Sequence, residues 1–120
     1  MAIATFVHGD TIMVDHTPSS AVAAGDIVVV GQECRIAHRD IAANALGSLA
    51  SPGGEGVYDI AKGAGELTAG AKVWWDASGE VATATQSTHK PLGFVVETAA
   101  SAATTVRVRH AYFSSELDAA

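Results

Sequence analysis

Residues 67–81, LTAGAKVWWDASGEV, are the stretch that decides the fold. A glycine turn leads into the apolar run 72–76, and residues 76–79 (DASG) have the composition of a tight hairpin turn. A short β-rich run between two turns indicates antiparallel strands. Side chains alternate between the two faces of a strand, so only one of Trp74 and Trp75 can point into a given core. The other ring is a candidate contact surface.

Glycine-containing turns divide the rest of the chain into similar short runs. The run 26–31 is apolar on both faces, which predicts a central or covered strand. Val106 and Val108 alternate with Arg107 and Arg109, which predicts a solvated or salt-bridged face for the two arginines. We predict an all-β fold, a small β-sandwich or β-barrel-like domain with short strands. The expected strands are residues 11–14, 26–31, 72–76, 80–85, 91–98 and 104–113.

Two segments of the chain resemble each other. Residues 22–31 (VAAGDIVVVG) align with residues 67–76 (LTAGAKVWWD), and each has a glycine turn that leads into an apolar strand. This similarity predicts two β-units that are built alike. Residues 39–51 (RDIAANALGSLAS) have apolar residues at helical spacing, but the segment is short and Gly47 interrupts it. We therefore expect a loop or a single helical turn there.

Length, charge and composition favour one small domain over residues 1–120. The formal net charge of −6 and the absence of a basic stripe argue against nucleic-acid binding. No run approaches the roughly 20 apolar residues of a membrane span, and no signal-peptide pattern is visible, so we expect synthesis in a cytoplasm and no membrane. Alanine is so frequent that the core is thin, which favours association with a partner. The single cysteine, Cys34, is expected to be a small core residue or an inert thiol.

The motifs of enzymes are incomplete in this chain. Residues 65–72 (GELTAGAK) resemble a phosphate loop, but Ala71 separates the glycine from the lysine and a strand follows. No serine stands in a nucleophile elbow. His8, Asp10, Asp15 and His16 are close in sequence, but their spacing matches no metal-binding signature and a solvated polar edge is the favoured interpretation. We predict no catalytic residue, no cofactor and no metal.

The order of motifs in AGAKVWWD, GEVATA, PLGFVVETA and TTVRVRH resembles that of the small cement, or decoration, proteins of tailed-phage capsids. Residues 6–32 are similar to the opening of that family, with a Gly-Asp, a strand, a polar loop and a second Gly-Asp strand. Residues 54–70 are similar to its middle, where a Gly-Val strand leads to a lysine and a glycine loop. The chain departs from the family in residues 34–56, whose path stays open, and in a longer C-terminus.

The resemblance implies a non-enzymatic protein on the outer surface of the phage head, made in the host cytoplasm. Such proteins commonly form homotrimers that clamp neighbouring subunits of the major capsid protein, and they oppose the pressure of packaged DNA. The interface needs apolar area rather than chemistry. The candidate interface residues are Ile3, Phe6, Val7, Trp74, Trp75, Tyr112 and Phe113.

Several alternatives stay open. Residues 1–10 form either an extended N-terminal arm that adds to a neighbouring sheet or an edge strand of the same domain. Both tryptophans are either covered within one subunit or divided between core and interface. Residues 114–120 are expected to be a mobile tail. A glycan- or surface-binding module that stacks sugars on Trp74, Trp75 or Tyr112 is the second function, and a metal-dependent hydrolase is the third.

Overall fold

A computed structural model describes residues 3–113 of the chain. It confirms the all-β fold, and the only helical element among these residues is a short 3-10 turn, η1 (Pro52–Gly54). No helix in the described part has the length and apolarity needed to cross a membrane. The strands are β1 (Ala4–His8), β2 (Ile12–His16), β3 (Ile27–Val30), β4 (Glu33–Ile36), β5 (Gly47–Ser51), β6 (Val57–Ala61), β7 (Lys72–Asp76), β8 (Val81–Thr83), β9 (Lys90–Val95) and β10 (Thr105–His110).

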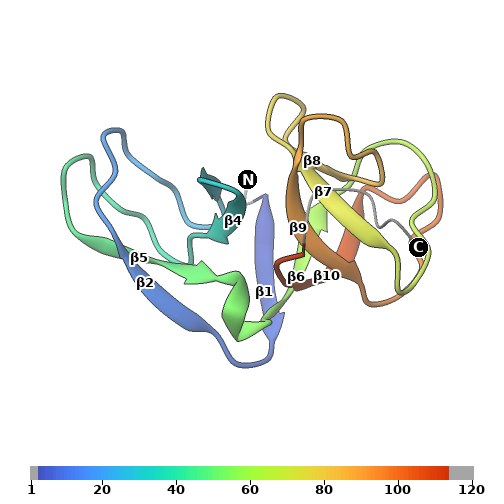
Figure 1. Cartoon of the computed structure of the whole chain (residues 1–120), viewed down its shortest axis with the longest axis horizontal. Helices are drawn as coiled ribbons and strands as arrows, with labels where there is room; N and C mark the ends of the chain where they lie inside the picture. The colour runs from blue at the N-terminus through green and yellow to red at the C-terminus, as the bar shows by residue number, and fades with distance from the viewer. Residues whose placement is uncertain (1–2, 114–120) are drawn as a thin grey trace.

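The strands form two antiparallel sheets (Figure 1). The first has six strands in the order β1-β6-β10-β9-β7-β8, and the second has four in the order β2-β5-β4-β3. In Figure 1 the four-stranded sheet lies on the left and the six-stranded sheet on the right, with β1 between them. Short strands with tight turns build both sheets, as the glycine punctuation predicts.

The two sheets contain two copies of one four-stranded unit. Repeat 1 is β2 to β5 (residues 12–51), and repeat 2 is β6 to β10 without β8 (residues 57–110). The strand order β2-β5-β4-β3 in one sheet corresponds to β6-β10-β9-β7 in the other. The register agrees as well, since the pairing of β2 with β5 from Ile12↔Ser51 to His16↔Gly47 has its equivalent in that of β6 with β10, from Val57↔Arg109 to Ala61↔Thr105.

Hydrogen bonds outside the strands repeat in the same way. In repeat 1 the amide of Gly25 donates to the carbonyl of Ala37 at 2.7 Å, and in repeat 2 that of Gly70 donates to Val95 at 2.8 Å. Each of these glycines has a positive φ, 91° and 87°, which the turn before the strand requires. The bridges Val22↔Ile41 and Leu67↔Ala99 are also equivalent. The similarity of residues 22–31 and 67–76 is thus confirmed as two β-units that are built alike.

The repeats differ at their edges. β3 connects to β4 through the two residues Gly31 and Gln32, whereas the equivalent strands β7 and β9 are separated by a longer segment that contains β8. β8 pairs with the outer edge of β7, and β1 pairs with the outer edge of β6. Both extra strands therefore belong to the six-stranded sheet.

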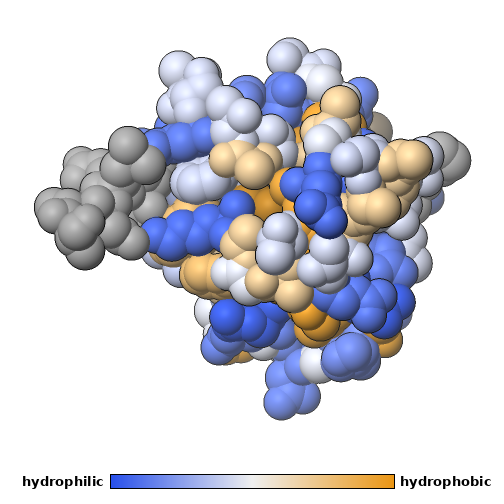
Figure 2. All heavy atoms as spheres, turned by 90° about the vertical axis from the view of Figure 1, so that its right-hand side faces the viewer, coloured by the Kyte–Doolittle hydropathy of each residue, from blue (hydrophilic) through white to orange (hydrophobic). Residues whose placement is uncertain are grey.

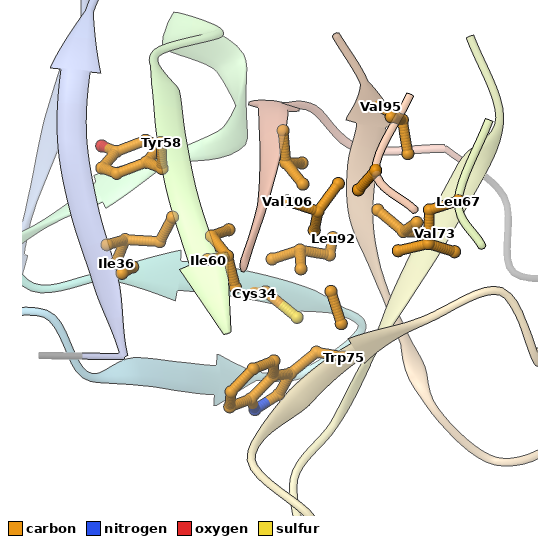
Figure 3. Packing of buried hydrophobic residues seen from close by; sticks show 14 of the residues in the cluster. Cys34, Ile36, Tyr58, Ile60, Leu67, Val73, Trp75, Leu92, Val95 and Val106 are labelled. Atoms are coloured by element: carbon orange, nitrogen blue, oxygen red, sulfur yellow. The ribbon is translucent and has the colours of Figure 1, made fainter. Parts of the chain in front are cut away.

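One hydrophobic cluster joins the two sheets (Figure 3). Cys34, Ile36 and Ala50 of the four-stranded sheet pack in it with the inward side chains of the six-stranded sheet. Figure 3 shows the latter group, including Tyr58, Ile60, Val73, Trp75, Leu92, Val95 and Val106. A second, smaller cluster of Ala37, Ile41 and Leu49 lies apart from it. Cys34 is fully buried, so the expected small core residue is confirmed, and burial raises the pKa of its thiol to about 12.

Three expectations need correction or are not confirmed. The extended N-terminal arm is not confirmed, because residues 4–8 form β1 and pair with β6 of the same chain. β3 is an edge strand rather than a central one, and it is only partly covered: Ile27 packs on the large cluster and Val28 on the small one, whereas Val29 is exposed. Residues 47–51, expected in a loop or helical turn, form β5 between β2 and β4. The expected mobile tail, residues 114–120, lies outside the described residues.

Candidate interaction surfaces

The seven candidate interface residues come from three elements. Ile3, Phe6 and Val7 lie in or next to β1, the tryptophans lie in β7, and Tyr112 and Phe113 follow β10. Only Phe6 and Tyr112 are strongly exposed, at 43% and 53%. Ile3, Val7 and Phe113 are half-buried. Their role in an interface stays a prediction.

Both tryptophans are buried within the chain, which is one of the two arrangements that the sequence left open. They point to opposite faces of β7, as alternation requires, and Trp75 packs in the large cluster. The Trp74 ring is covered on the other face by Phe113, edge to face, with ring centroids 5.4 Å apart. The indole Nε1 of Trp74 has no hydrogen-bond partner among the described residues.

Phe113 belongs to a cluster on the outer face of the six-stranded sheet. Its ring also lies 5.4 Å from that of Phe94, and the Lys72 ammonium is 5.4 Å from its centroid. Arg109 stacks over Phe94 at 5.0 Å. These contacts stabilise the segment after β10. Phe113 therefore serves as a cover for Trp74, and Tyr112 next to it is the exposed ring.

A second aromatic group surrounds β1. Phe6 packs on His38 and Tyr58, with ring centroids 5.1 and 5.5 Å away. A shallow depression of about 230 Å³ next to these rings is lined mainly by Ala4, Gly25 and other small residues. Ile3 packs against the large cluster. The N-terminal strand is thus held by side-chain contacts as well as by its pairing with β6.

Two histidines lie beside Tyr58. His38 Nε2 and the Tyr58 hydroxyl are 2.6 Å apart, and burial lowers the pKa of His38 and raises that of Tyr58. His110 is almost fully buried, and its Nε2 donates to the carbonyl of Cys34 at 2.7 Å. Burial lowers the pKa of His110, and Nδ1 has no partner among the described residues. A neutral ring with the proton on Nε2 fits this site.

The arginines of β10 are paired, as the alternation predicts. Arg107 donates to both oxygens of Asp59, at 2.9 and 3.2 Å, and Arg109 contacts Glu55. Lys62, directly after β6, is buried, and its ammonium donates to the carbonyls of Gly63, Ser101 and Ala103 at 2.9, 3.2 and 3.4 Å. A buried ammonium needs such acceptors, so Lys62 fixes two loops against the end of the sheet.

The four residues of the metal alternative do not meet. His8 and Asp10 precede β2, whereas Asp15 and His16 lie at its far end. Over residues 3–113 no group of three or more His, Cys, Asp or Glu side chains is placed to hold a metal ion. Residues 76–79 (DASG) form a turn as predicted, in which Asp76 accepts hydrogen bonds from the Gly79 amide and from the hydroxyl and amide of Ser78. The bonds from Gly79 and from the Ser78 hydroxyl are the main causes that lower the pKa of Asp76.

The structure exposes apolar side chains that the sequence did not single out. Leu46 is 71% exposed, Ile12 54% and Met13 40%, and Val29 and Val96 are also exposed. Ile12, Met13, Val29 and Leu46 belong to repeat 1. Consecutive apolar residues in a short strand normally indicate a covered strand, so the sequence carried no signal for them. Met13 and Leu46 line a groove of about 550 Å³ with His38, Arg39, Asp40 and Ile41.

The side of the six-stranded sheet looks different. Figure 2 shows that end of the molecule, where hydrophilic side chains cover much of the visible surface and hydrophobic ones occur in small separate areas. Of the seven large apolar side chains that are exposed among residues 3–113, four belong to repeat 1.

Comparison with known proteins gives one match. A family model described as phage cement protein matches residues 6–110, from β1 to the end of β10. The match includes both repeats and leaves out Ile3, Tyr112 and Phe113. No curated protein and no solved structure matches the chain.

Proposed function

Because the chain belongs to the phage cement protein family, we propose that it binds the outer surface of the assembled head and bridges neighbouring major capsid protein subunits. Membership of the family assigns the chain a role as capsid cement in the virion. The finer proposal is that the bound protein stabilises the shell against the pressure of packaged DNA, as a homotrimer, without catalysis or cofactor. The protein is made in the host cytoplasm before it joins the head.

The family match carries this proposal, and the surface of repeat 1 supports it. Cement acts through buried interface area, which contributes roughly 25 cal/mol per Å² of apolar surface before ordering costs. Ile12, Met13 and Leu46 supply exposed apolar surface that the fold itself does not use. Phe6 and Tyr112 add exposed rings of the kind enriched at interfaces.

The glycan-binding alternative loses two of its three platforms. Trp74 and Trp75 are 8% and 3% exposed, so neither ring offers a free face for stacking a sugar. Tyr112 is the remaining candidate. A glycan titration followed by tryptophan fluorescence separates the two functions, since cement alone predicts no response.

Co-sedimentation tests the proposed function. Purified protein is mixed with heads of the parent phage that lack cement, over a concentration series, and the pellet is quantified. The proposal predicts saturable binding at a fixed ratio to the major capsid protein. Protein that stays in the supernatant at every concentration contradicts it.

A further inference from the structure

The two repeats leave different sheet edges uncovered. In the six-stranded sheet the four strands of repeat 2 are flanked by β1 on one side and β8 on the other. In the four-stranded sheet, β2 and β3 have no further strand beside them among the described residues. An edge strand presents unpaired backbone N–H and C=O groups that can pair with another chain. The edges of β6 and β7 are thus covered in repeat 2, whereas the equivalent edges of β2 and β3 are uncovered in repeat 1.

The β2 edge exposes more apolar surface than the β3 edge, since Ile12 and Met13 are exposed on β2 and Val29 alone is exposed on β3. Its sequence, IMVDH, has none of the lysines or prolines that commonly protect edge strands. Ile12 and Met13 are exposed on it, and Met13 also lines the 550 Å³ groove with Leu46. In Figure 1, β2 runs along the lower margin of the left-hand sheet. An extended segment beside β2 would find backbone partners and apolar surface together.

The pairing of β1 with β6 gives the geometry of such a complex. β6 and β2 are equivalent strands, and β1 is antiparallel to β6 with Ala4 opposite Ile60 and Phe6 opposite Tyr58. By the register of the repeats, Asp15 corresponds to Ile60 and Met13 to Tyr58. A strand could pair with β2 in the way that β1 pairs with β6. One residue of that strand would then lie opposite Asp15, and the residue two positions later would lie opposite Met13.

The charges near β2 indicate which side chains the added strand should have. Asp10 and Asp15 are exposed at the two ends of β2, and no lysine or arginine precedes Arg35 in the chain. Arg39 and Asp40 on the groove wall have opposite charges. Opposite charges directly across a strand pair stabilise it, as do apolar cross-strand pairs. The β2 edge therefore favours a basic residue beside Asp15 and a large apolar residue beside Met13.

We infer that the β2 edge binds an extended segment of the major capsid protein as an added antiparallel strand. The segment carries a basic residue followed, two positions later, by a large apolar residue. Main-chain hydrogen bonds supply affinity in this mode and alternate side chains supply specificity. The inference rests on the proposed function, because it identifies the part of the capsid partner that the cement protein holds.

Hydrogen exchange on bound heads tests the inference. The probe is the full-length protein, free and saturated on heads without cement, with exchange read by mass spectrometry. Amides of residues 12–16 are expected to exchange at least about tenfold more slowly in the bound protein. Unchanged exchange there in protein that does co-sediment overturns the inference and leaves the proposed function standing. Failure to co-sediment overturns both, so the two failures are distinguishable.

A charge reversal with a matched control tests the chemistry of the edge. Asp15→Lys is expected to raise the Kd for heads about tenfold or more, since a like charge faces the basic residue. Glu66→Lys makes the same charge change at an exposed turn of repeat 2 and is expected to bind like the unmodified protein. Equal Kd values for the two folded variants contradict the inference.

Sedimentation velocity tests whether a second copy of the chain, rather than a capsid segment, binds at the β2 edge. If a second copy fills it, the free protein is an oligomer that Asp15→Lys dissociates while the Kd for heads is unchanged. That result overturns the capsid segment as the occupant. Retention of the oligomeric state by Asp15→Lys, together with weaker head binding, supports it.

Discussion

Gly93 lies where the backbone of β10 leaves no room for a side chain. A Cβ at this position would overlap the carbonyl oxygen of Arg109 and crowd Val108. Both neighbours belong to the centre of the six-stranded sheet, so neither can move without breaking strand pairing. A glycine in the middle of a strand is here a condition for close approach of two backbones.

We predict that Gly93→Ala lowers the free energy of unfolding by about 1–3 kcal/mol, the usual cost of forcing atoms into a packed interior. Gly53→Ala is the control, because a Cβ there meets its nearest atom, the Ser51 hydroxyl, at 3.4 Å. The control should stay within about 0.5 kcal/mol of the unmodified protein in urea unfolding. Equal losses in the two variants would contradict this account of Gly93.

His110 makes stability depend on pH. Burial lowers its pKa below the ordinary value of 6.5, so the unfolded chain takes up a proton at a higher pH than the folded one. The stabilising contribution is therefore complete above about pH 6.5 and decreases as the pH falls toward the folded pKa. His38, whose pKa burial also lowers, acts in the same direction.

We predict that His110→Gln flattens the fall in unfolding free energy between about pH 7 and 5.5. Glutamine keeps an N–H donor for the Cys34 carbonyl and does not titrate. Urea unfolding at several pH values gives the slope. A variant whose slope equals that of the unmodified protein would show that His110 does not carry the effect.

At the scale of elements, β1 is a structural strand in this chain. It pairs with β6 of repeat 2 through Ala4, Thr5 and Phe6. The amide of Ala4 also donates to the carbonyl of Gly25 in repeat 1, at 2.9 Å. Ala4 is buried in the large cluster. β1 therefore connects the two repeats as well as covering the edge of β6.

We predict that deletion of residues 1–8 lowers the melting temperature by about 5–10 °C, because it removes a strand pairing and uncovers the edge of β6. Thr5→Ala, an exposed change on the same strand, should leave the melting temperature within about 1 °C. Differential scanning calorimetry compares the three proteins. If the deletion variant had the same melting temperature as the full-length chain, β1 would not stabilise the fold and the prediction of a free N-terminal arm would be favoured again.

Local sequence patterns made six of the ten described strands predictable. β2, β3, β7, β8, β9 and β10 overlap the expected runs. A glycine turn precedes β2, β3, β7 and β8, and alternating valines and arginines mark β10. The sequence similarity of residues 22–31 and 67–76 also indicated the duplication. It could not show that the whole strand order and register repeat, since β4 and β5 have little sequence similarity to β9 and β10.

Strands without a local signal were not predictable. β5 is GSLAS, and its strand conformation depends on the full burial of Leu49 and Ala50 between neighbouring strands. The cover of Trp74 comes from Phe113, far along the chain, so its burial could not be derived from alternation. The exposed edge of β2 was not predictable for the same reason, because only the strand order of the folded sheet shows which strand lies at its edge.

At the scale of the whole molecule, the two repeats differ in how much of their edges and apolar surface the fold covers. Repeat 2 is closed at both edges by β1 and β8 and contributes most of the large cluster. Repeat 1 adds Cys34, Ile36 and Ala50 to that cluster and keeps two uncovered edges and much of the exposed apolar surface. We propose that the chain is one domain in which repeat 2 supports a partner-binding repeat 1.

The central claim is that binding of this protein stabilises the phage capsid. The most direct test is the temperature at which DNA-filled heads release their DNA, followed with a dye that binds free DNA. Heads without cement are heated alone, with saturating protein, or with an unrelated protein of similar charge. The account predicts release at a higher temperature only for heads saturated with the cement protein. Release at the same temperature from saturated and bare heads would contradict it.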